Sequence, residues 1–439
     1  MSNVWPQSAL RDVDGALVIG GVDVRDAAAT YETPLFLLDE ADVRARARAY
    51  RDAAELVGAR KVYYAAKAFL STSVARWVHE EGLGLDVASG GELAVALRAG
   101  VPGADLLLHG NNKSMAEIET AMNAGVARIV VDSFEEIVRV ADAASRAGIV
   151  QPVLVRLTIG VEAHTHEFIA TAHEDQKFGF SVASGAAEEA IRRIVKLPSL
   201  EFRGLHSHIG SQIFDTDGFE EAAVRIVAFI DQLRADHVID VAELDLGGGM
   251  GIAYLPSDDP LVIQDLALHV AEVVRRECAS CQLPVPALAF EPGRAIVGPA
   301  GVTIYEVGTV KPVQLEDGVR TYVSVDGGMS DNIRTALYDA QYTVELASRS
   351  SKAEPMLVRV VGKHCESGDI VIREAYLPSD LVPGDLLAVA ATGAYCRSMA
   401  SNYNYLPKPA VIGVRDGKSS VVLRRETLDD LLALDPGAQ

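Results

Sequence analysis

Short apolar runs alternate with longer amphipathic segments between about residue 40 and residue 291 of the chain. The eight apolar runs are Lys61–Ala65, Leu83–Val87, Leu106–His109, Arg128–Val131, Pro152–Leu157, Arg203–His208, Glu243–Leu246 and Leu288–Glu291. The segments around them carry apolar residues at three- and four-residue spacing, as helices with one buried face do. These segments are Glu40–Val57, Ser71–Glu81, Gly91–Ala99, Ser114–Asn123, Phe134–Ala147, Ser184–Val195, Gly218–Ala235 and Ile263–Cys278. The pattern predicts strands that alternate with helices.

Alternating strands and helices indicate a parallel sheet, and eight units of this length favour a closed barrel. An open doubly wound sheet is the alternative. After Gly298 the pattern changes to β-rich runs, such as Val302–Val310 and Thr321–Asp326, with short or absent helical segments. We therefore predict an α/β fold in which a (β/α)8 barrel of residues 36–297 is joined to an all-β domain of residues 1–35 and 298–439.

Composition and charge narrow the class of protein. A chain of 439 residues with 49% hydrophobic residues can bury the cores of two domains. Its net charge of -21 repels nucleic acid and anionic membranes, so we expect neither as a partner. Four cysteines are too few for a disulfide scaffold, and neither a signal peptide nor an apolar stretch of about 20 residues is visible. We expect a cytoplasmic protein.

The ends of the predicted strands carry the candidate chemistry, because barrels of this kind place reactive groups there. Gly247–Gly251 follows the seventh strand, and Glu291-Pro292-Gly293-Arg294 follows the eighth. A glycine run lets backbone N–H groups surround an anion, and Arg294 adds positive charge. We predict a phosphate site here. A plain tight turn is one alternative; a dinucleotide fingerprint is another, but it needs a first βαβ unit and a ribose-binding acid.

Lys67 follows the first predicted strand and lies between apolar residues, where we expect its ammonium to be desolvated. Burial lowers the pKa of a lysine and makes its amine nucleophilic. A phosphate site combined with such a lysine indicates pyridoxal phosphate. Glu291 would keep the ring nitrogen of that cofactor protonated, and His208 would stack on the ring. The alternatives are a lysine that extends to solvent and purely structural roles for Glu291 and His208.

Several motifs together resemble the diaminopimelate decarboxylases, from about Thr33 to Leu432. The motifs are Tyr64-Ala65-Ala66-Lys67-Ala68, Asp86-Val87-Ala88-Ser89-Gly90-Gly91-Glu92, His206-Ser207-His208-Ile209-Gly210-Ser211, Gly247–Gly251, Glu291-Pro292-Gly293-Arg294 and Cys365-Glu366-Ser367-Gly368-Asp369. The resemblance implies an alanine-racemase-like fold, with a barrel that binds pyridoxal 5'-phosphate. It also implies decarboxylation of meso-2,6-diaminopimelate to L-lysine and CO2, the last step of lysine biosynthesis.

The resemblance further implies roles for individual residues. Lys67 would form the Schiff base with the cofactor, with His208 stacked on its ring. Cys365 would donate a proton from the second subunit of a homodimer, together with Glu366. The predicted cofactor contacts are Lys67, Asp86, His208, Ser211, Gly248, Gly249, Glu291, Gly293, Arg294 and Tyr395. The predicted substrate contacts are Arg294, Arg334, Tyr338, Glu366 and Tyr395.

The spacing of Arg334 and Tyr338 agrees with such a role, because residues four apart share one face of a helical turn. An arginine there can bind a carboxylate at two points. The alternative is a surface ion pair of Arg334 with Asp331 or Asp339. Cys365, likewise, could be a small buried hydrophobe, as free cysteines often are.

Three other functions fit the sequence less well. An ornithine- or arginine-type decarboxylase of the same fold is disfavoured by Arg334, which would face the distal cation of such a substrate. An alanine racemase is disfavoured by Glu291, because racemases of this fold place an arginine at the ring nitrogen of the cofactor. A non-catalytic cofactor carrier is disfavoured by the presence of both Lys67 and Cys365.

We predict no metal site. Cys278 and Cys281 lack the second ligand pair that a zinc site needs. His164, His166 and His173 lie in a long segment after the fifth strand, which we interpret as a mobile loop over the active site rather than as metal ligands.

Overall fold

The computed structural model describes residues 1–160, 177–316 and 318–438, and it divides into two compact units. The barrel unit consists of Arg46–Gly251 and Pro260–Gly293. The β unit consists of Met1–Ala45, Ile252–Asp259 and Arg294–Gln439. The assignment of residues 36–297 to one functional domain stays a prediction.

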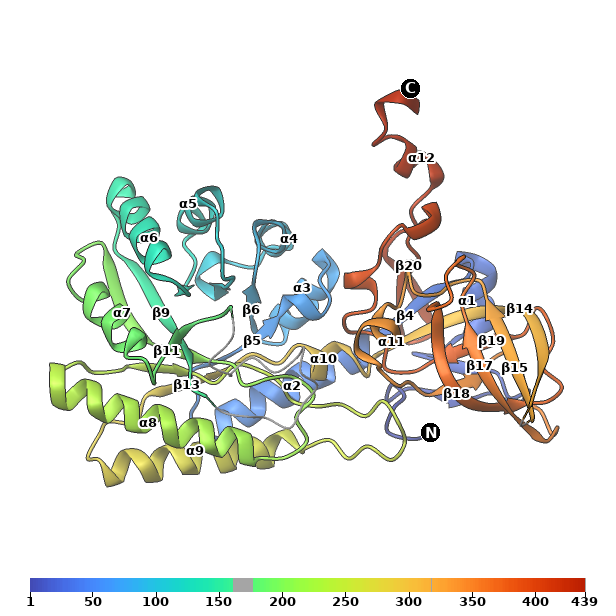
Figure 1. The fold of residues 1–439 in the computed structure, drawn as a ribbon, viewed down its shortest axis with the longest axis horizontal. Coiled ribbons are helices and arrows are strands. Elements are labelled where there is room, and N and C mark those ends of the chain that lie inside the picture. The colour runs from blue at the N-terminus through green and yellow to red at the C-terminus, as the bar shows by residue number, and fades with distance from the viewer. Residues whose placement is uncertain (161–176, 317, 439) are drawn as a thin grey trace. The chain divides into compact units, whose positions relative to one another are not determined.

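Eight parallel strands close the barrel unit (Figure 1). In order around the barrel they are β5 (Lys61–Ala65), β6 (Gly84–Val87), β7 (Leu106–Leu108), β8 (Arg128–Val131), β9 (Gln151–Thr158), β11 (Leu200–Ser207), β12 (Glu243–Asp245) and β13 (Ala287–Phe290). The short strand β10 (Phe180–Ser181) adds to the end of β9. Closure comes from the pairing of β13 with β5, through Ala289 with Lys61 and Phe290 with Val62. The open-sheet alternative is therefore wrong.

Helices surround these strands (Figure 1). They are α3 (Thr72–Glu80), α4 (Gly90–Arg98), α5 (Met115–Ala124), α6 (Phe134–Ala147), α7 (Ala186–Ile194), α8 (Asp217–His237) and α9 (Ile263–Ser280), and α2 (Glu40–Leu56) leads into β5. A serine begins each of α3 to α6 and accepts a hydrogen bond from the backbone N–H three residues on. The caps are Ser71, Ser89, Ser114 and Ser133. Each satisfies a free amide at the point where the chain turns from strand to helix.

The two ends of the barrel differ in chemistry. At the N-terminal end, Glu243 of β12 accepts hydrogen bonds from Arg128 at 2.5 and 3.0 Å and from Arg203 at 3.3 Å, and it also pairs with Arg60. These side chains form a network of opposite charges, which is a stabilising arrangement. The C-terminal end holds the groups described in the next section.

The β unit is built around a sheet in the order β18-β17-β15-β14-β4-β20-β21, with β16 and β19 pairing beside β14. Its strands are β4 (Leu35–Asp39), β14 (Gly301–Leu315), β15 (Gly318–Val325), β16 (Val344–Leu346), β17 (Pro355–Val361), β18 (Ile370–Pro378), β19 (Leu386–Val389), β20 (Ala410–Arg415) and β21 (Lys418–Leu423). A small sheet contains β1 (Leu10–Arg11), β2 (Leu17–Ile19) and β3 (Val22–Asp23). Short helices are α1 (Val24–Tyr31), α10 (Arg294–Val297), α11 (Arg334–Tyr338) and α12 (Leu428–Leu432).

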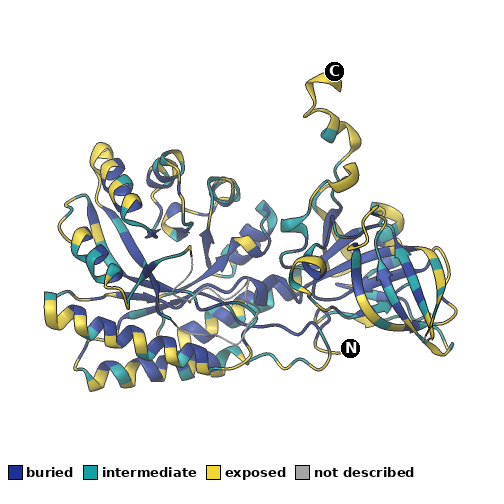
Figure 2. Ribbon diagram, viewed as in Figure 1, coloured by how far each residue is buried: buried dark blue, intermediate teal, exposed yellow. Residues whose placement is uncertain are grey.

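Apolar side chains of β2, β4, β14 and β20 form one buried core in the β unit. Figure 2 colours the buried residues of these strands dark blue. Leu17, Leu35, Leu37, Ile304 and Ile412 belong to it. The strand β4 pairs with both β14 and β20, so residues just before α2 are part of this sheet.

The predicted fold class, a (β/α)8 barrel with a mainly β second domain, is confirmed. The ends of helices α2 to α9 lie within two residues of the predicted ends, and α6 matches its predicted segment at both ends. The predicted loop with His164, His166 and His173 lies outside the described residues. Among the described residues, no helix is both long and apolar enough to cross a membrane.

Candidate active site

Glu291 is a buried carboxylate held between two histidines at the C-terminal end of the barrel. It follows β13, while His109 follows β7 and His206 lies in β11. His206 Nε2 lies 3.0 Å from Glu291 Oε2 in a hydrogen bond, and His109 Nε2 lies 2.7 Å from Glu291 Oε1. The two imidazole rings meet edge to face with their centroids 4.7 Å apart. Side chains from three strands far apart in the sequence therefore fix one carboxylate.

Three buried carboxyl groups, those of Glu291, Asp245 and Asp86, lie near one another, and Glu291 is the one that keeps its negative charge. Burial alone would raise its pKa, but His109 and His206 together hold that pKa well below the usual value. The neighbouring carboxyls behave in the opposite way. Burial, followed by repulsion from Glu291, raises the pKa of Asp245. Burial also raises the pKa of Asp86, although His109, whose Nε2 lies 3.7 Å away, opposes this.

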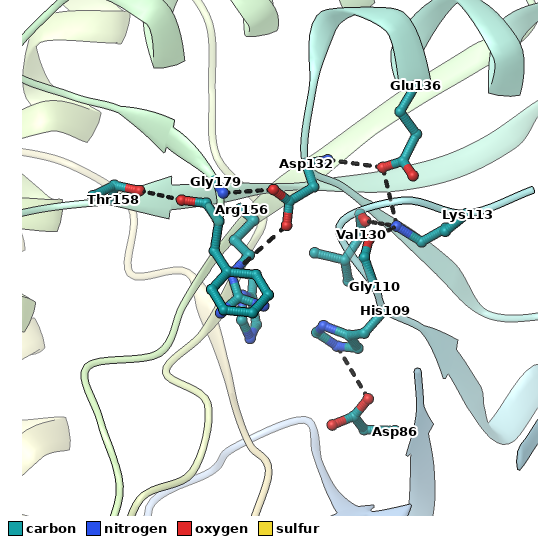
Figure 3. Close-up of polar contacts among 12 residues, drawn as sticks. Asp86, His109, Gly110, Lys113, Val130, Asp132, Glu136, Arg156, Thr158 and Gly179 are labelled. Atoms are coloured by element: carbon teal, nitrogen blue, oxygen red, sulfur yellow. Dashed lines mark hydrogen bonds and ion pairs between the residues drawn. The ribbon is translucent and has the colours of Figure 1, made fainter. Parts of the chain in front are cut away.

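The loop that carries His109 is fastened by the buried ammonium of Lys113 (Figure 3). Lys113 Nζ donates to the carbonyls of Gly110 and Val130, both at 2.6 Å, and to Glu136 Oε2 at 3.0 Å. All three ammonium protons thus have acceptors. The same Glu136 oxygen accepts from the backbone N–H of Asp132 at 2.8 Å. This network joins the ends of β7 and β8 and so fixes the position of His109.

The glycine run after β12 has a backbone conformation that residues with side chains rarely adopt. Gly247 and Gly249 have φ angles of +66° and +113°. A Cβ on Gly248 would lie 2.2 Å from the carbonyl oxygen of Glu291, and one on Gly293 would lie 2.8 Å from that of Ala65. The backbone N–H groups of Gly249 and Gly293 donate to no described residue. Free amides on side-chain-free loops after adjacent strands fit a phosphate group.

Lys67 lies directly after β5, in the single turn Ala66–Ala68. Ala66 and Ala68 are buried, but Lys67 is exposed. The expected desolvation by apolar neighbours is therefore wrong, because the turn buries the two alanines and directs the lysine away from them. Lys67 nevertheless acts on His208, whose pKa is well below its usual value because desolvation disfavours the charged ring and Lys67 repels it. His208 Nδ1 also accepts from Gly248 N–H at 3.3 Å.

The β unit holds a cluster of arginine and tyrosine side chains. Arg334 Nη1, on α11, donates to the hydroxyls of Tyr254 at 2.9 Å and Tyr342 at 2.6 Å. Arg294 Nη1 donates to the same Tyr254 hydroxyl at 2.5 Å. Tyr338 also lies on α11, and its ring centroid is 5.9 Å from the Arg334 guanidinium carbon, so these two residues share a face as predicted.

The alternative of a surface ion pair for Arg334 is wrong. Asp339 pairs with Arg373, and Asp331 accepts from Tyr305 and from the backbone N–H of Gly328. Arg334 is 6% exposed and forms no ion pair with any described residue. It is thus a buried cation whose hydrogen-bond partners are phenols rather than carboxylates. Such a guanidinium can donate hydrogen bonds to a carboxylate of a ligand.

Tyr395 packs against Arg294 of this cluster, and Cys365 lies in another loop of the β unit. The Arg294 guanidinium carbon lies 4.7 Å from the ring centroid of Tyr395, whose φ of +62° places it in the left-handed region. Such a conformation is costly for a tyrosine, which indicates that the surrounding structure fixes it. Cys365 and Glu366 are both exposed, so Cys365 is not a buried hydrophobe. The neighbouring His364 is buried and bonds to Ser330 Oγ at 2.8 Å, which anchors this loop.

The donor atoms of His109, His206 and Glu291 lie within 4.8 Å of one another, which is close enough for a metal ion. Glu291 Oε2 already forms a hydrogen bond with His206, and Glu291 Oε1 already lies 2.7 Å from His109 Nε2. A carboxylate between two imidazoles equally fits a cationic ring nitrogen.

Comparison with known proteins bears on this choice. A family model described as the pyridoxal binding domain of pyridoxal-dependent decarboxylases matches residues 40–298. The diaminopimelate decarboxylase of Mycobacterium tuberculosis is 57% identical over 438 residues, covering 99% of this chain and 98% of that protein. This chain belongs to the diaminopimelate decarboxylases.

Relatives from other organisms agree with this membership. The diaminopimelate decarboxylase of Bacillus subtilis is 45% identical over 422 residues, covering 96% of this chain and 95% of that protein. The crystal structure of the M. jannaschii enzyme in complex with L-lysine has a TM-score of 0.89 at 30% identity, covering 98% of each chain. A lysine/ornithine decarboxylase from Vibrio vulnificus, at 24% identity and a TM-score of 0.75, shares the fold.

Some prominent residues were not assigned a role from the sequence. His109 and His206 were visible as residues at strand ends, but their partner, Glu291, is distant in sequence. Tyr254 follows the glycine run without a motif of its own, and Tyr342 lies four residues beyond the predicted pair. A signal existed only for the histidines, through their positions after the third strand and in the sixth.

We predict that His206 makes folding sensitive to acid. Burial, which outweighs the attraction of Glu291, lowers the pKa of His206 to about 4 from its ordinary 6.5. Between these values the unfolded chain binds a proton that the folded chain does not, so stability falls as the pH falls through this window. From pH 7.5 to 4.5 the wild type should lose roughly 2–3 kcal/mol more than a His206→Gln variant.

The measurement is the free energy of unfolding in urea at each pH. His269→Gln serves as a control, because the His269 side chain is 38% exposed and lies 2.9 Å from Glu220 Oε2. That variant should follow the wild type. Parallel curves for the wild type and His206→Gln would contradict the prediction.

Proposed function

We propose that this chain removes one carboxylate of meso-2,6-diaminopimelate as CO2 and releases L-lysine. The observation that carries the proposal is Arg334, a buried cation with phenol partners and no acidic partner among the described residues. Diaminopimelate has a second carboxylate at the end remote from the reaction, and lysine and ornithine lack one there. A guanidinium left without a carboxylate selects for the substrate that supplies it.

Pyridoxal 5'-phosphate is the proposed cofactor, and its covalent attachment would be to Lys67. When bound, this group supplies an electron sink for the electron pair of the breaking carbon–carboxylate bond. Glu291, kept anionic by His109 and His206, would hold a proton on the ring nitrogen. The free N–H groups of Gly249 and Gly293 would bind the phosphate, with Arg294, Ser211 and Gly248 as further contacts. His208 would stack on the ring.

The chain's own residues would then handle binding and protons. Arg334 and Tyr338 would bind the distal carboxylate, and Tyr395 would position the amino acid. Asp86, whose raised pKa favours its neutral form, would lie beside Lys67, which acts on it electrostatically. Cys365 would protonate the carbon that has lost its carboxylate, and Lys67 would accept and return a proton as product leaves.

We also propose that the protein is cytoplasmic and that it forms a homodimer with shared active sites. Cys365 and Glu366 are exposed on the β unit, beside the anchored residue His364. An exposed thiol cannot exclude water from a reaction by itself. Delivery of Cys365 and Glu366 into the barrel of a second copy would meet that need, and twofold symmetry would do so at two equivalent sites.

The first prediction concerns the cofactor lysine. Borohydride reduction of the protein with bound cofactor, followed by digestion and mass spectrometry, should place the pyridoxyl mass on Lys67. Lys113 is the internal control, because its three protons are already donated and it is buried. A label on any lysine other than Lys67 would contradict the assignment.

The second prediction concerns substrate choice. Leaving a buried guanidinium unpaired costs about 3–5 kcal/mol, so lysine and ornithine should be poorer substrates than diaminopimelate by on the order of 10² to 10³ or more in kcat/KM. Arg334→Ala should lose most activity on diaminopimelate and keep the absorption of the bound cofactor. CO2 release across these amino acids is the measurement.

Arg373→Ala is the matched control, because Arg373 is a half-exposed arginine that pairs with Asp339 after the same helix. It should leave CO2 release unchanged. Comparable turnover of ornithine and diaminopimelate by the wild type would refute the proposed function.

The third prediction concerns the shared site. Lys67→Ala and Cys365→Ala should each be nearly inactive, while a mixture with free subunit exchange should regain about a quarter of wild-type activity. Half the dimers become hybrids, and each hybrid has one intact site of two. Activity and subunit exchange are measured separately, the latter with tagged chains. If exchange occurs without recovered activity, both residues act in one subunit.

A further inference from the structure

Tyr254 links two buried arginines through one hydroxyl group. Arg294 Nη1 donates to the Tyr254 oxygen at 2.5 Å, and Arg334 Nη1 donates to it at 2.9 Å. All three residues belong to the β unit and are nearly or fully buried. The guanidinium carbons of Arg294 and Arg334 lie 5.9 and 5.2 Å from the Tyr254 ring centroid. Two like charges are therefore held near each other by a neutral group.

The Tyr254 hydroxyl group has a proton that it can still donate. The Tyr254 oxygen uses its lone pairs as the acceptor of two hydrogen bonds, so its own proton remains to be donated. No described residue accepts that proton. Tyr342 differs, because its hydroxyl lies 3.6 Å from Cys396 Sγ and so has a second partner. The Nε and Nη2 groups of Arg334 likewise have no acceptor among the described residues.

Hydrogen bonds to both the backbone N–H and the backbone carbonyl of Tyr254 fix its position. Its N–H donates to Asp258 Oδ2 at 2.9 Å, and its carbonyl accepts from the Thr343 backbone at 3.1 Å and hydroxyl at 2.8 Å. Its ring packs edge to face on Tyr342, with the centroids 5.1 Å apart. The Tyr254 hydroxyl oxygen is thus held in place, 2.9 Å from Arg334 Nη1, on the same guanidinium that carries the free N–H groups, as a preorganised binding group is.

We propose that Tyr254 is a further residue that determines substrate specificity, and that its hydroxyl donates a hydrogen bond to the distal carboxylate bound by Arg334. This inference rests on the proposed function, because that function supplies the carboxylate. A carboxylate has about four lone-pair positions, and the free N–H groups of Arg334 together with the Tyr254 hydroxyl match them. A phenol suits the position because it satisfies Arg334 without neutralising it. An acidic side chain there would compete with the substrate.

The test removes only the hydroxyl. Tyr254→Phe keeps the ring beside both arginines, but it removes the two hydrogen bonds that the hydroxyl accepts from Arg294 and Arg334 and the one that we propose it donates to the substrate. We expect kcat/KM for diaminopimelate to fall about 10- to 100-fold, mainly through KM, with the cofactor absorption unchanged. Exposed Tyr376→Phe, on β18, should match the wild type.

A binding measurement separates specificity from general damage. L-lysine retains the distal carboxylate and cadaverine lacks it, and the binding of each is followed by the change in cofactor absorption. Tyr254→Phe should weaken L-lysine by a similar 10- to 100-fold and leave cadaverine within about twofold. Because the two ligands are compared in the same variant, partial misfolding affects both equally.

Each outcome supports or overturns either the inference or the proposed function. A loss for L-lysine alone supports the inference. Equal losses for both ligands, or equal effects of Tyr254→Phe and Tyr342→Phe, overturn it, because Tyr254 then only positions Arg334. Wild-type protein that releases no CO2 from diaminopimelate overturns the proposed function itself, whereas an active wild type with an unaffected Tyr254→Phe overturns the inference alone.

Discussion

The pairing of the last barrel strand with the first is the constraint on which the candidate site depends. Only Ala289 and Phe290 of β13 pair with β5, and the backbone N–H of Ala65 extends the contact to the carbonyl of Pro292 at 3.1 Å. This closure brings the turn with Lys67 and the segment with Glu291 to one rim. The approach leaves no room for a side chain on Gly293, whose Cβ would lie 2.8 Å from the carbonyl oxygen of Ala65.

Burial of charge is the second organising constraint, and each unit resolves it differently. The barrel places three carboxyls close together but keeps the charge on Glu291 by surrounding it with two imidazoles, while the pKa values of Asp86 and Asp245 rise. The β unit buries Arg334 and satisfies it with phenol oxygens, which carry no charge. In both units, polar side chains in fixed positions surround one buried ion.

Periodicity was sufficient to predict the barrel because its strands are short, apolar and buried on both sides. It could not predict the partners of individual side chains. The hydrogen bond of His206 with Glu291 and that of Tyr254 with Arg334 join residues 85 and 80 positions apart. The exposure of Lys67 was missed because apolar neighbours in sequence do not determine where a side chain points within a tight turn. The glycine run could be recognised from local sequence, since its chemistry depends on local backbone and residue type, whereas Arg334 was indicated by the resemblance to the diaminopimelate decarboxylases.

The arginine–tyrosine cluster has a consequence for turnover. The distal carboxylate of diaminopimelate is untouched by the proposed reaction and remains in L-lysine. Contacts made by Arg334 and Tyr254 would therefore stabilise substrate, transition state and product alike, which lowers KM without raising the rate of the bond-breaking step. The same cluster that would reject diamino acids without a distal carboxylate would also retain the product. Product that accumulates would therefore slow an enzyme with this cluster, without the need for a separate regulatory site.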